Sequence, residues 1–109
     1  MAERSNELTN KLVRRFFLGF INLHILYHAQ KEPIYGKDFK KELERHGYNI
    51  SFGTLYPIFH SLENDGYLEI EEKNIKGKIR KYYTITEKGK EVYNYSLDRA
   101  KELFDELFG

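Results

Sequence analysis

The sequence has 109 residues with no cysteine, no tryptophan and only two prolines. Without cysteine, disulfides, thiol catalysis and cysteine-ligated zinc are excluded. The longest stretch free of charged side chains is Phe16 to Gln30, fifteen residues, whereas a membrane-spanning helix needs roughly 20. Met1 to Glu7 has no apolar stretch of the kind found in signal peptides. We therefore expect a cytoplasmic protein.

The charged residues are unevenly distributed along the chain. The net charge is only +1, which does not by itself indicate a nucleic-acid-binding protein. However, Glu63 to Glu72 contains five acidic residues and no cation, and Lys73 to Lys81 contains five cations and no acidic residue. This separation predicts a basic surface where the second segment is exposed.

Two helices are predicted in the first half of the chain. Apolar residues at helical spacing run from Leu8 to about Lys31, and Pro33 ends this helix because a proline disfavours helical backbone at the residue before it. A second, amphipathic helix is predicted from Lys37 to about His46. The first helix is apolar around most of its circumference, so it must be covered on more than one side.

A third helix is predicted between Ser51, a good N-cap, and Gly66. Pro57 leaves two possibilities open. If Thr54 is the effective cap, Pro57 falls in the first turn, where backbone N–H groups lack helical partners anyway. If Ser51 is the cap, we expect a slight kink. The expected buried stripe of this helix is Leu55, Ile58, Phe59 and Leu62.

After Gly66 the apolar spacing changes from helical to alternating. Two strands are predicted, around Tyr67–Ile70 and Arg80–Ile85, joined through Asn74–Lys78 with Gly77 in the middle. The result is a β-hairpin with a basic tip. Thr86 is then expected to cap a last helix that runs to Phe108.

This order of elements predicts a mainly α fold with a small β-hairpin wing, a winged helix-turn-helix in the order ααα-ββ-α. We expect one domain over residues 1–109, with a DNA-binding core including the N-terminal helix at 8–85 and a dimerisation helix at 86–108. In such a fold the third helix is presented to the major groove of DNA.

Specific runs of residues resemble a known family. Ser51 to Pro57 reads Ser-Phe-Gly-Thr-Leu-Tyr-Pro, with Tyr35-Gly36 upstream and the segment Arg80 to Gly89 downstream. Together they resemble the PadR-like transcriptional regulators, over about residues 12–108. The resemblance implies a dimeric repressor whose third helix enters the major groove, whose wing touches the backbone or minor groove, and whose terminal helices form the dimer interface. The single short C-terminal helix is similar to the smaller subfamily.

The sequence departs from this family at two positions. Phe52 stands where the family usually has proline, so either the entry into the third helix is angled differently or Phe52 packs inward. Lys37 stands where the family often has an aromatic residue, and it adds a candidate phosphate contact.

The predicted partner is double-stranded DNA, bound as an inverted-repeat operator by a homodimer. The third helix offers short polar and aromatic groups to the groove but no arginine to read guanine. The wing cations are expected to neutralise phosphates, giving affinity largely independent of sequence. The expected DNA-binding residues are Ser51, Thr54, Tyr56, Pro57, His60, Lys37, Lys73, Lys76, Lys78, Arg80 and Lys81.

The last helix carries apolar residues spaced 4, 3, 4 and 3 apart, a heptad pattern that requires a partner helix. Aromatic residues also lie on the first helix, so a flat hydrophobic effector could insert between the terminal helices. The residues on which this effector hypothesis depends are Phe16, Phe20, Tyr93, Tyr95 and Phe104. The expected dimer interface is Phe16, Phe20, Tyr93, Leu97, Ala100, Phe104 and Leu107.

The sequence is also compatible with three other interpretations. His24 and His28 have the i,i+4 spacing of a metal-binding pair, but the sequence identifies no third ligand, which favours a structural role. Ser51, His60 and Asp65 are residue types of a catalytic triad, but capping explains Ser51. We therefore expect no enzyme activity, no cofactor and no metal. The alternative function is a winged-helix module that binds another protein without specific DNA binding.

Overall fold

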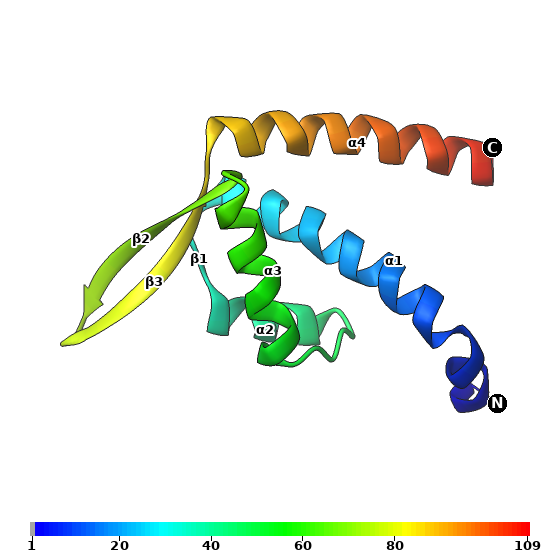
Figure 1. The fold of residues 1–109 in the computed structure, drawn as a ribbon, viewed down its shortest axis with the longest axis horizontal. Coiled ribbons are helices and arrows are strands. Elements are labelled where there is room, and N and C mark those ends of the chain that lie inside the picture. The colour runs from blue at the N-terminus through cyan, green and yellow to red at the C-terminus, as the bar shows by residue number, and fades with distance from the viewer. Residues whose placement is uncertain (1) are drawn as a thin grey trace.

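The computed structural model describes the backbone of residues 2–109 and the side chains of residues 11–109. Its described part contains helices and a three-stranded antiparallel sheet (Figure 1), which confirms the predicted fold class. The elements, in chain order, are α1 (Ala2–Lys31), β1 (Ile34–Tyr35), α2 (Gly36–Arg45), α3 (Phe52–Asn64), β2 (Leu68–Ile75), β3 (Lys78–Ile85) and α4 (Glu87–Phe108).

The helix ends follow the predicted capping residues. Ser51 is the N-cap of α3, because its Oγ accepts a hydrogen bond from the Thr54 backbone N–H at 3.2 Å. Pro57 therefore lies inside α3 rather than in a first turn capped by Thr54. Thr86 caps α4 in the same way, with its Oγ1 accepting from the Gly89 N–H at 3.0 Å. One boundary was wrong, since α1 begins at Ala2, before the predicted start.

The sheet has the strand order β1-β3-β2, and β1 is an element that the sequence did not predict. The two residues of β1 pair with Tyr83 and Tyr82 of β3. The predicted hairpin is confirmed, but its turn is tighter than expected. Only Lys76 and Gly77 separate β2 from β3, and both have positive φ, as a type I′ turn requires.

The core lies where α1, α2 and α3 meet one face of the sheet. Phe59 of α3 is fully buried and stacks on Tyr83 of β3 with ring centroids 4.6 Å apart. Ile58 is only partly buried, so the predicted stripe of α3 is narrower than expected. The largest fully buried side chains are Phe59, Ile25, Leu43, Leu55 and Leu68.

Gly89 allows α4 to start directly against the sheet. A Cβ atom at this position would overlap the carbonyl oxygen of Tyr67 and lie 2.7 Å from Cγ1 of Ile85. The Thr86 hydroxyl also donates to the carbonyl oxygen of Gly66 at 2.6 Å. The first turn of α4 is thus fixed to the segment that connects α3 with β2.

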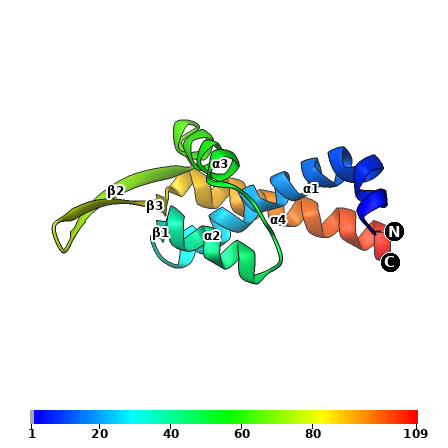
Figure 2. The same cartoon turned by 90° about the horizontal axis from the view of Figure 1, so that it is seen from below.

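The molecule is elongated, 48 × 31 × 22 Å, with the β2–β3 hairpin extending from one end (Figures 1 and 2). Helix α4 runs beside α1 in the opposite direction, and the two helices contact each other. The first half of α1 diverges from the second half of α4 in Figure 1. Within residues 2–109, no helix combines the length and hydrophobicity needed to cross a membrane.

Candidate nucleic-acid interface

The side chains predicted to face DNA gather on the exposed side of α3. Tyr56, Pro57 and His60 are exposed, Ser51 is exposed at the cap, and Thr54 is partly exposed. The opposite side of the helix holds the buried Leu55 and Phe59 side chains. The polar and aromatic side of α3 is therefore not covered by the described part of the chain.

Tyr56 is held in place by the start of α2. A Cβ atom on Gly36 would lie 2.8 Å from Cε1 of the Tyr56 ring, so only glycine leaves room for this ring. This contact joins α2 to the exposed side of α3.

Phe52 does not pack inward, which was one of the two alternatives for this position. Its ring is partly exposed and stacks on Tyr56, with centroids 5.2 Å apart and planes at 12°. Tyr56 in turn stacks on His60 at 6.4 Å and 17°. Sequence reasoning missed Phe52 as a candidate surface residue because the direction of this side chain depends on the exact start of α3.

The cations of the β2–β3 hairpin lie on two different faces of the sheet. Lys81 is two residues from Tyr83, so strand alternation places it on the face that packs against α3. Arg80 points the other way, with its guanidinium 4.8 Å from the centre of the Tyr35 ring. Lys73 is paired with Arg80 in the register and lies 4.9 Å from the Tyr82 ring centre. Lys78 shares the Arg80 face, and Lys76 is in the turn.

A groove joins α3 to the hairpin. It has a volume of about 320 Å³ and is lined by Tyr56 and His60 of α3 and by Ile79, Arg80 and Lys81 of β3. None of the ion pairs found among residues 11–109 involves a hairpin cation. The structure thus brings Arg80 and Lys81 beside the α3 surface, whereas Lys37 lies exposed in the first turn of α2.

Arg14 is a further cation near α3 that sequence reasoning missed. Its Nη2 lies 3.5 Å from the Thr54 hydroxyl, to which it donates. The two residues are 40 positions apart in the sequence, so no local pattern could have paired them. Through this contact α1 adds positive charge at the N-terminal end of α3, where helix geometry already favours anions.

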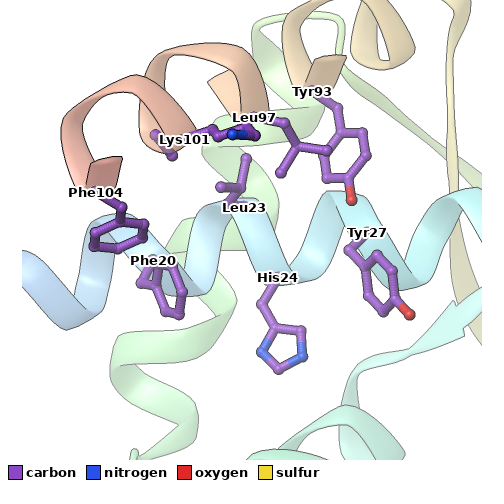
Figure 3. A pocket seen from close by; sticks show the side chains of 9 residues that line it. Phe20, Leu23, His24, Tyr27, Tyr93, Leu97, Lys101 and Phe104 are labelled. Carbon is purple, nitrogen blue, oxygen red and sulfur yellow. The ribbon is translucent and has the colours of Figure 1, made fainter. Parts of the chain in front are cut away.

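A second surface lies between α1 and α4 and contains most of the predicted dimer residues (Figure 3). A groove of about 470 Å³ is lined by Phe20, Leu23, His24 and Tyr27 of α1 and by Tyr93, Leu97, Ala100, Lys101 and Phe104 of α4. We call it the terminal-helix groove. Tyr93 is buried at its inner end, whereas Phe16 and Leu107 lie outside it and are 54% and 73% exposed. Tyr95 is exposed and does not line this groove.

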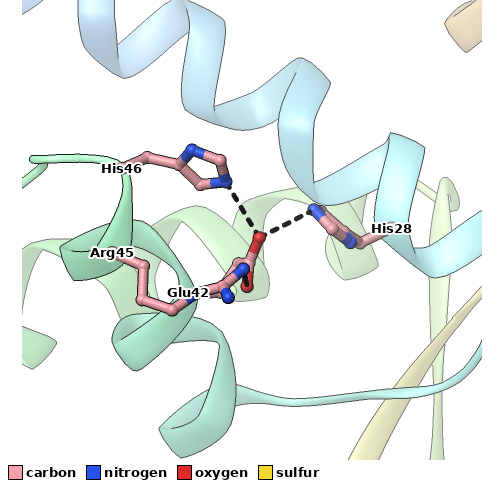
Figure 4. Close-up of polar contacts among 4 residues, drawn as sticks. All are labelled: His28, Glu42, Arg45 and His46. Atoms are coloured by element: carbon pink, nitrogen blue, oxygen red, sulfur yellow. Dashed lines mark hydrogen bonds and ion pairs between the residues drawn. The ribbon is translucent and has the colours of Figure 1, made fainter.

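His24 and His28 face α2, where Glu42 and His46 meet them. Glu42 Oε2 lies 3.0 Å from Nε2 of His46 and 3.8 Å from Nε2 of His28 (Figure 4). Burial, reinforced at His24 by the neighbouring His28, lowers the pKa of both His24 and His28 below the ordinary value. Within the described chain, no three His, Asp or Glu side chains are placed to hold a metal ion.

Ser51 is occupied by capping and does not form a triad. Its Oγ accepts from the Thr54 N–H and donates to the Thr54 Oγ1 at 3.3 Å. Among residues 11–109, no hydrogen bond found joins it to His60 or Asp65. The arrangement of α2, α3 and the hairpin defines instead a winged helix-turn-helix, the fold class of many transcriptional regulators.

Comparison with known proteins identifies the family. The sequence profile described as "Transcriptional regulator PadR-like family" matches residues 25–95. The chain belongs to this family, which consists of DNA-binding transcriptional regulators rather than enzymes. The predicted resemblance is thereby confirmed.

Individual relatives agree with this assignment. The chain is 38% identical over 97 residues to the transcriptional regulator Rv3488 of Mycobacterium tuberculosis, covering 89% of this chain and 91% of that protein. A PadR family regulator from Eggerthella lenta is 30% identical, with a TM-score of 0.83 over 96% of this chain and 93% of its own. A PadR-like transcription factor from Bacteroides fragilis is 30% identical, with a TM-score of 0.76 over 89% and 95% of the two chains.

Proposed function

We propose that this chain is a homodimeric repressor that binds an inverted-repeat operator in the cytoplasm. One observation carries the proposal: α3 and β3 line the same groove, so Tyr56 and His60 lie beside Lys81, and Arg80 borders that groove from the opposite face of the sheet. A helix that presents polar and aromatic groups, flanked by unpaired cations, fits base edges bordered by phosphates. In the proposed complex α3 enters the major groove and the hairpin touches the backbone.

The DNA-contacting set proposed is the one expected from the sequence, extended by two residues. Arg14 joins it because it reaches Thr54 at the start of α3, and Phe52 joins it because it stacks on Tyr56. Lys78 and Lys73, on the far face of the hairpin, are proposed to meet phosphates that lie beyond the groove contacted by α3.

The apolar residues left uncovered on α1 and α4 support the dimer. Phe16, Phe20 and Leu107 are exposed at the divergent ends of these helices. Aromatic and leucine side chains gathered on one surface are typical of an interface between protein chains. In a twofold dimer the two α3 helices would lie one helical turn of DNA apart, about 34 Å.

The terminal-helix groove supports a planar hydrophobic effector as part of the proposal. Its volume of about 470 Å³ falls within the range of about 300 to 1,000 Å³ typical of small-molecule sites. Binding would release the operator if the effector favours a dimer whose α3 helices are wrongly spaced. A thermal shift screen with planar aromatic compounds, followed by competition against bound DNA, tests this part.

The experiment that tests the main proposal is selection of bound sequences from a pool of random DNA duplexes. We expect enrichment of an inverted repeat, because a twofold dimer contacts two equivalent half-sites. Enrichment of a single half-site would contradict the dimer but keep the DNA-binding role. No enrichment would overturn the proposal and favour the alternative, a winged-helix module that binds another protein.

A further inference from the structure

The exposed side of α3 carries three rings in a row, Phe52, Tyr56 and His60, which we call the aromatic row. They are four residues apart, so they lie on one side of the helix. Their centroids are separated by 5.2 Å and then 6.4 Å, and neighbouring planes differ by only 12° and 17°. The row is therefore about 12 Å long, measured along the helix.

The same helix lacks the side chains that usually identify bases. From Phe52 to Asn64 there is no arginine, lysine or glutamine, and the one asparagine is the last residue of the helix. Guanine is commonly read by arginine or lysine, and adenine by asparagine or glutamine. The Thr54 hydroxyl is already engaged by Ser51 and Arg14. Helix α3 therefore has few side chains that can identify DNA bases through hydrogen bonds.

Cations border the aromatic row on both sides. The Lys40 ammonium of α2 lies 5.4 Å from the centre of the Phe52 ring and is paired with Glu44 at 2.6 Å. Across the groove, Lys81 of β3 faces the side of the sheet on which α3 packs and lines the same groove as Tyr56 and His60. An apolar row with free cations along its hairpin side suits the major groove, where bases lie beside phosphate backbones. The apolar group that bases offer there is the 5-methyl group of thymine.

We propose that the aromatic row recognises thymine through its 5-methyl groups. This inference rests on the proposed function, and it names what α3 reads in the DNA. Phe52 and Tyr56 form the apolar contact, and Gly36 leaves room for the Tyr56 ring in this position. Each half-site of the operator then carries thymines where α3 docks, and specificity arises from burial of methyl groups rather than from bidentate hydrogen bonds.

Replacing thymine by deoxyuridine in the selected duplex tests the proposal, because it removes only the methyl group and keeps base pairing. Each thymine is replaced in turn, and dissociation constants are measured at fixed salt by fluorescence anisotropy. We expect about a fourfold loss of affinity for each contacted methyl, the value for one buried carbon. The loss should be confined to thymines beneath α3. Equal affinity for every substituted duplex would overturn the proposal.

Variants connect the effect to the aromatic row. Phe52→Ala should weaken binding to the thymine duplex and abolish the difference between thymine and deoxyuridine at one position. Lys78→Ala, the matched control on the hairpin, should weaken both duplexes equally and preserve that difference. Circular dichroism checks that each variant is folded. A full thymine preference in folded Phe52→Ala would contradict a role for this ring.

Gly36→Ala provides a second, independent variant. The added Cβ would displace the Tyr56 ring, so thymine preference should fall even though no residue of the aromatic row is changed. If the wild-type chain binds no duplex in the selection, both the proposed function and this inference fail. If it binds a repeat but ignores the methyl groups, only this inference fails.

Discussion

The two halves of the molecule differ in how far they bury their apolar side chains. We call α2, α3 and the sheet the recognition half, and α1 with α4 the terminal-helix half. Among the exposed large apolar side chains of residues 11–109, only Tyr56 and Ile79 belong to the recognition half. All the others lie on α1 or α4. The recognition half thus buries nearly all of its large apolar side chains within one chain, whereas the terminal-helix half leaves many of its own exposed.

The comparison predicts separate consequences for stability and assembly. A change in the buried core of the recognition half, or where α4 starts against the sheet, should destabilise the fold. A change on the exposed part of the terminal-helix half should leave the chain folded but alter its partners.

Phe104→Asp or Leu97→Asp should have the largest effect, the loss of the proposed dimer. Each places a charge on the apolar surface that the proposed dimer buries, and an unpaired buried charge is strongly unfavourable. Sedimentation velocity should show monomers, and DNA affinity should fall by orders of magnitude because the two half-sites are no longer bound together. Tyr95→Asp, on the same helix but outside the terminal-helix groove, is the control and should stay dimeric. An intact Phe104→Asp dimer would refute the heptad assignment.

Gly89→Ala should destabilise the chain by about 3 kcal/mol or more. The added methyl overlaps the Tyr67 carbonyl oxygen, which belongs to the backbone and cannot move aside easily. Gly19→Ala is the matched control, since nothing lies within 4 Å of its Cβ; there, replacement of a helical glycine should stabilise by about 0.5 to 1 kcal/mol. Urea denaturation measures both. Equal stability of Gly89→Ala and wild type would show that α4 is not fixed to the sheet here.

Removing Lys78 and Arg80 together should weaken binding to all duplexes alike. The plot of log affinity against log salt should become shallower by about one unit for each phosphate that is no longer neutralised. The control, Lys90→Ala with Arg99→Ala, removes the same charge from α4, where both cations are paired with acids. An unchanged slope for Lys78 and Arg80 would remove the hairpin from the interface. Lys81→Ala then shows which face of the hairpin matters more.

The smallest effect concerns pH. Burial lowers the pKa of His24 and His28, with Glu42 opposing and Lys31 reinforcing the shift at His28, so the folded state binds fewer protons than the unfolded state just below about pH 6.5. Stability should therefore fall as the pH decreases through about 6.5 and level off below the folded pKa values. Thermal unfolding between about pH 7.5 and about pH 5 measures this. The double variant His24→Gln with His28→Gln should lose less stability as the pH decreases. The variant His60→Gln, which changes an exposed histidine, should lose as much stability as the wild type.

Much of the fold could be predicted because its determinants are local. Ser51 and Thr86 begin helices through hydrogen bonds that span three residues, and Gly66 follows the end of α3. Strand β1 could not be predicted, because two residues show no periodicity and their pairing with β3 is long-range. The start of α1 at Ala2 was missed because the first residues lack an apolar stripe.

The residues of the candidate interface could be predicted from the sequence, but the directions in which their side chains point could not. The cations of the hairpin were evident, yet their division between two faces depends on a register set by the two-residue turn at Lys76–Gly77. The contact of Arg14 with Thr54 joins residues distant in the sequence. The direction of Phe52 depends on which residue caps α3, and the sequence left two possibilities open.

The connection between α1, in the terminal-helix half, and β1, in the recognition half, is very short. Only Glu32 and Pro33 separate the end of α1 from β1, and two extended residues span at most about 7 Å. Backbone hydrogen bonds fasten β1 to β3, the strand that carries Arg80 and Lys81. If a bound compound moves α1 by more than a few ångströms, as the proposed effector would, β1 and with it β3 should move too. This short connection would then couple the proposed effector site to the proposed DNA interface.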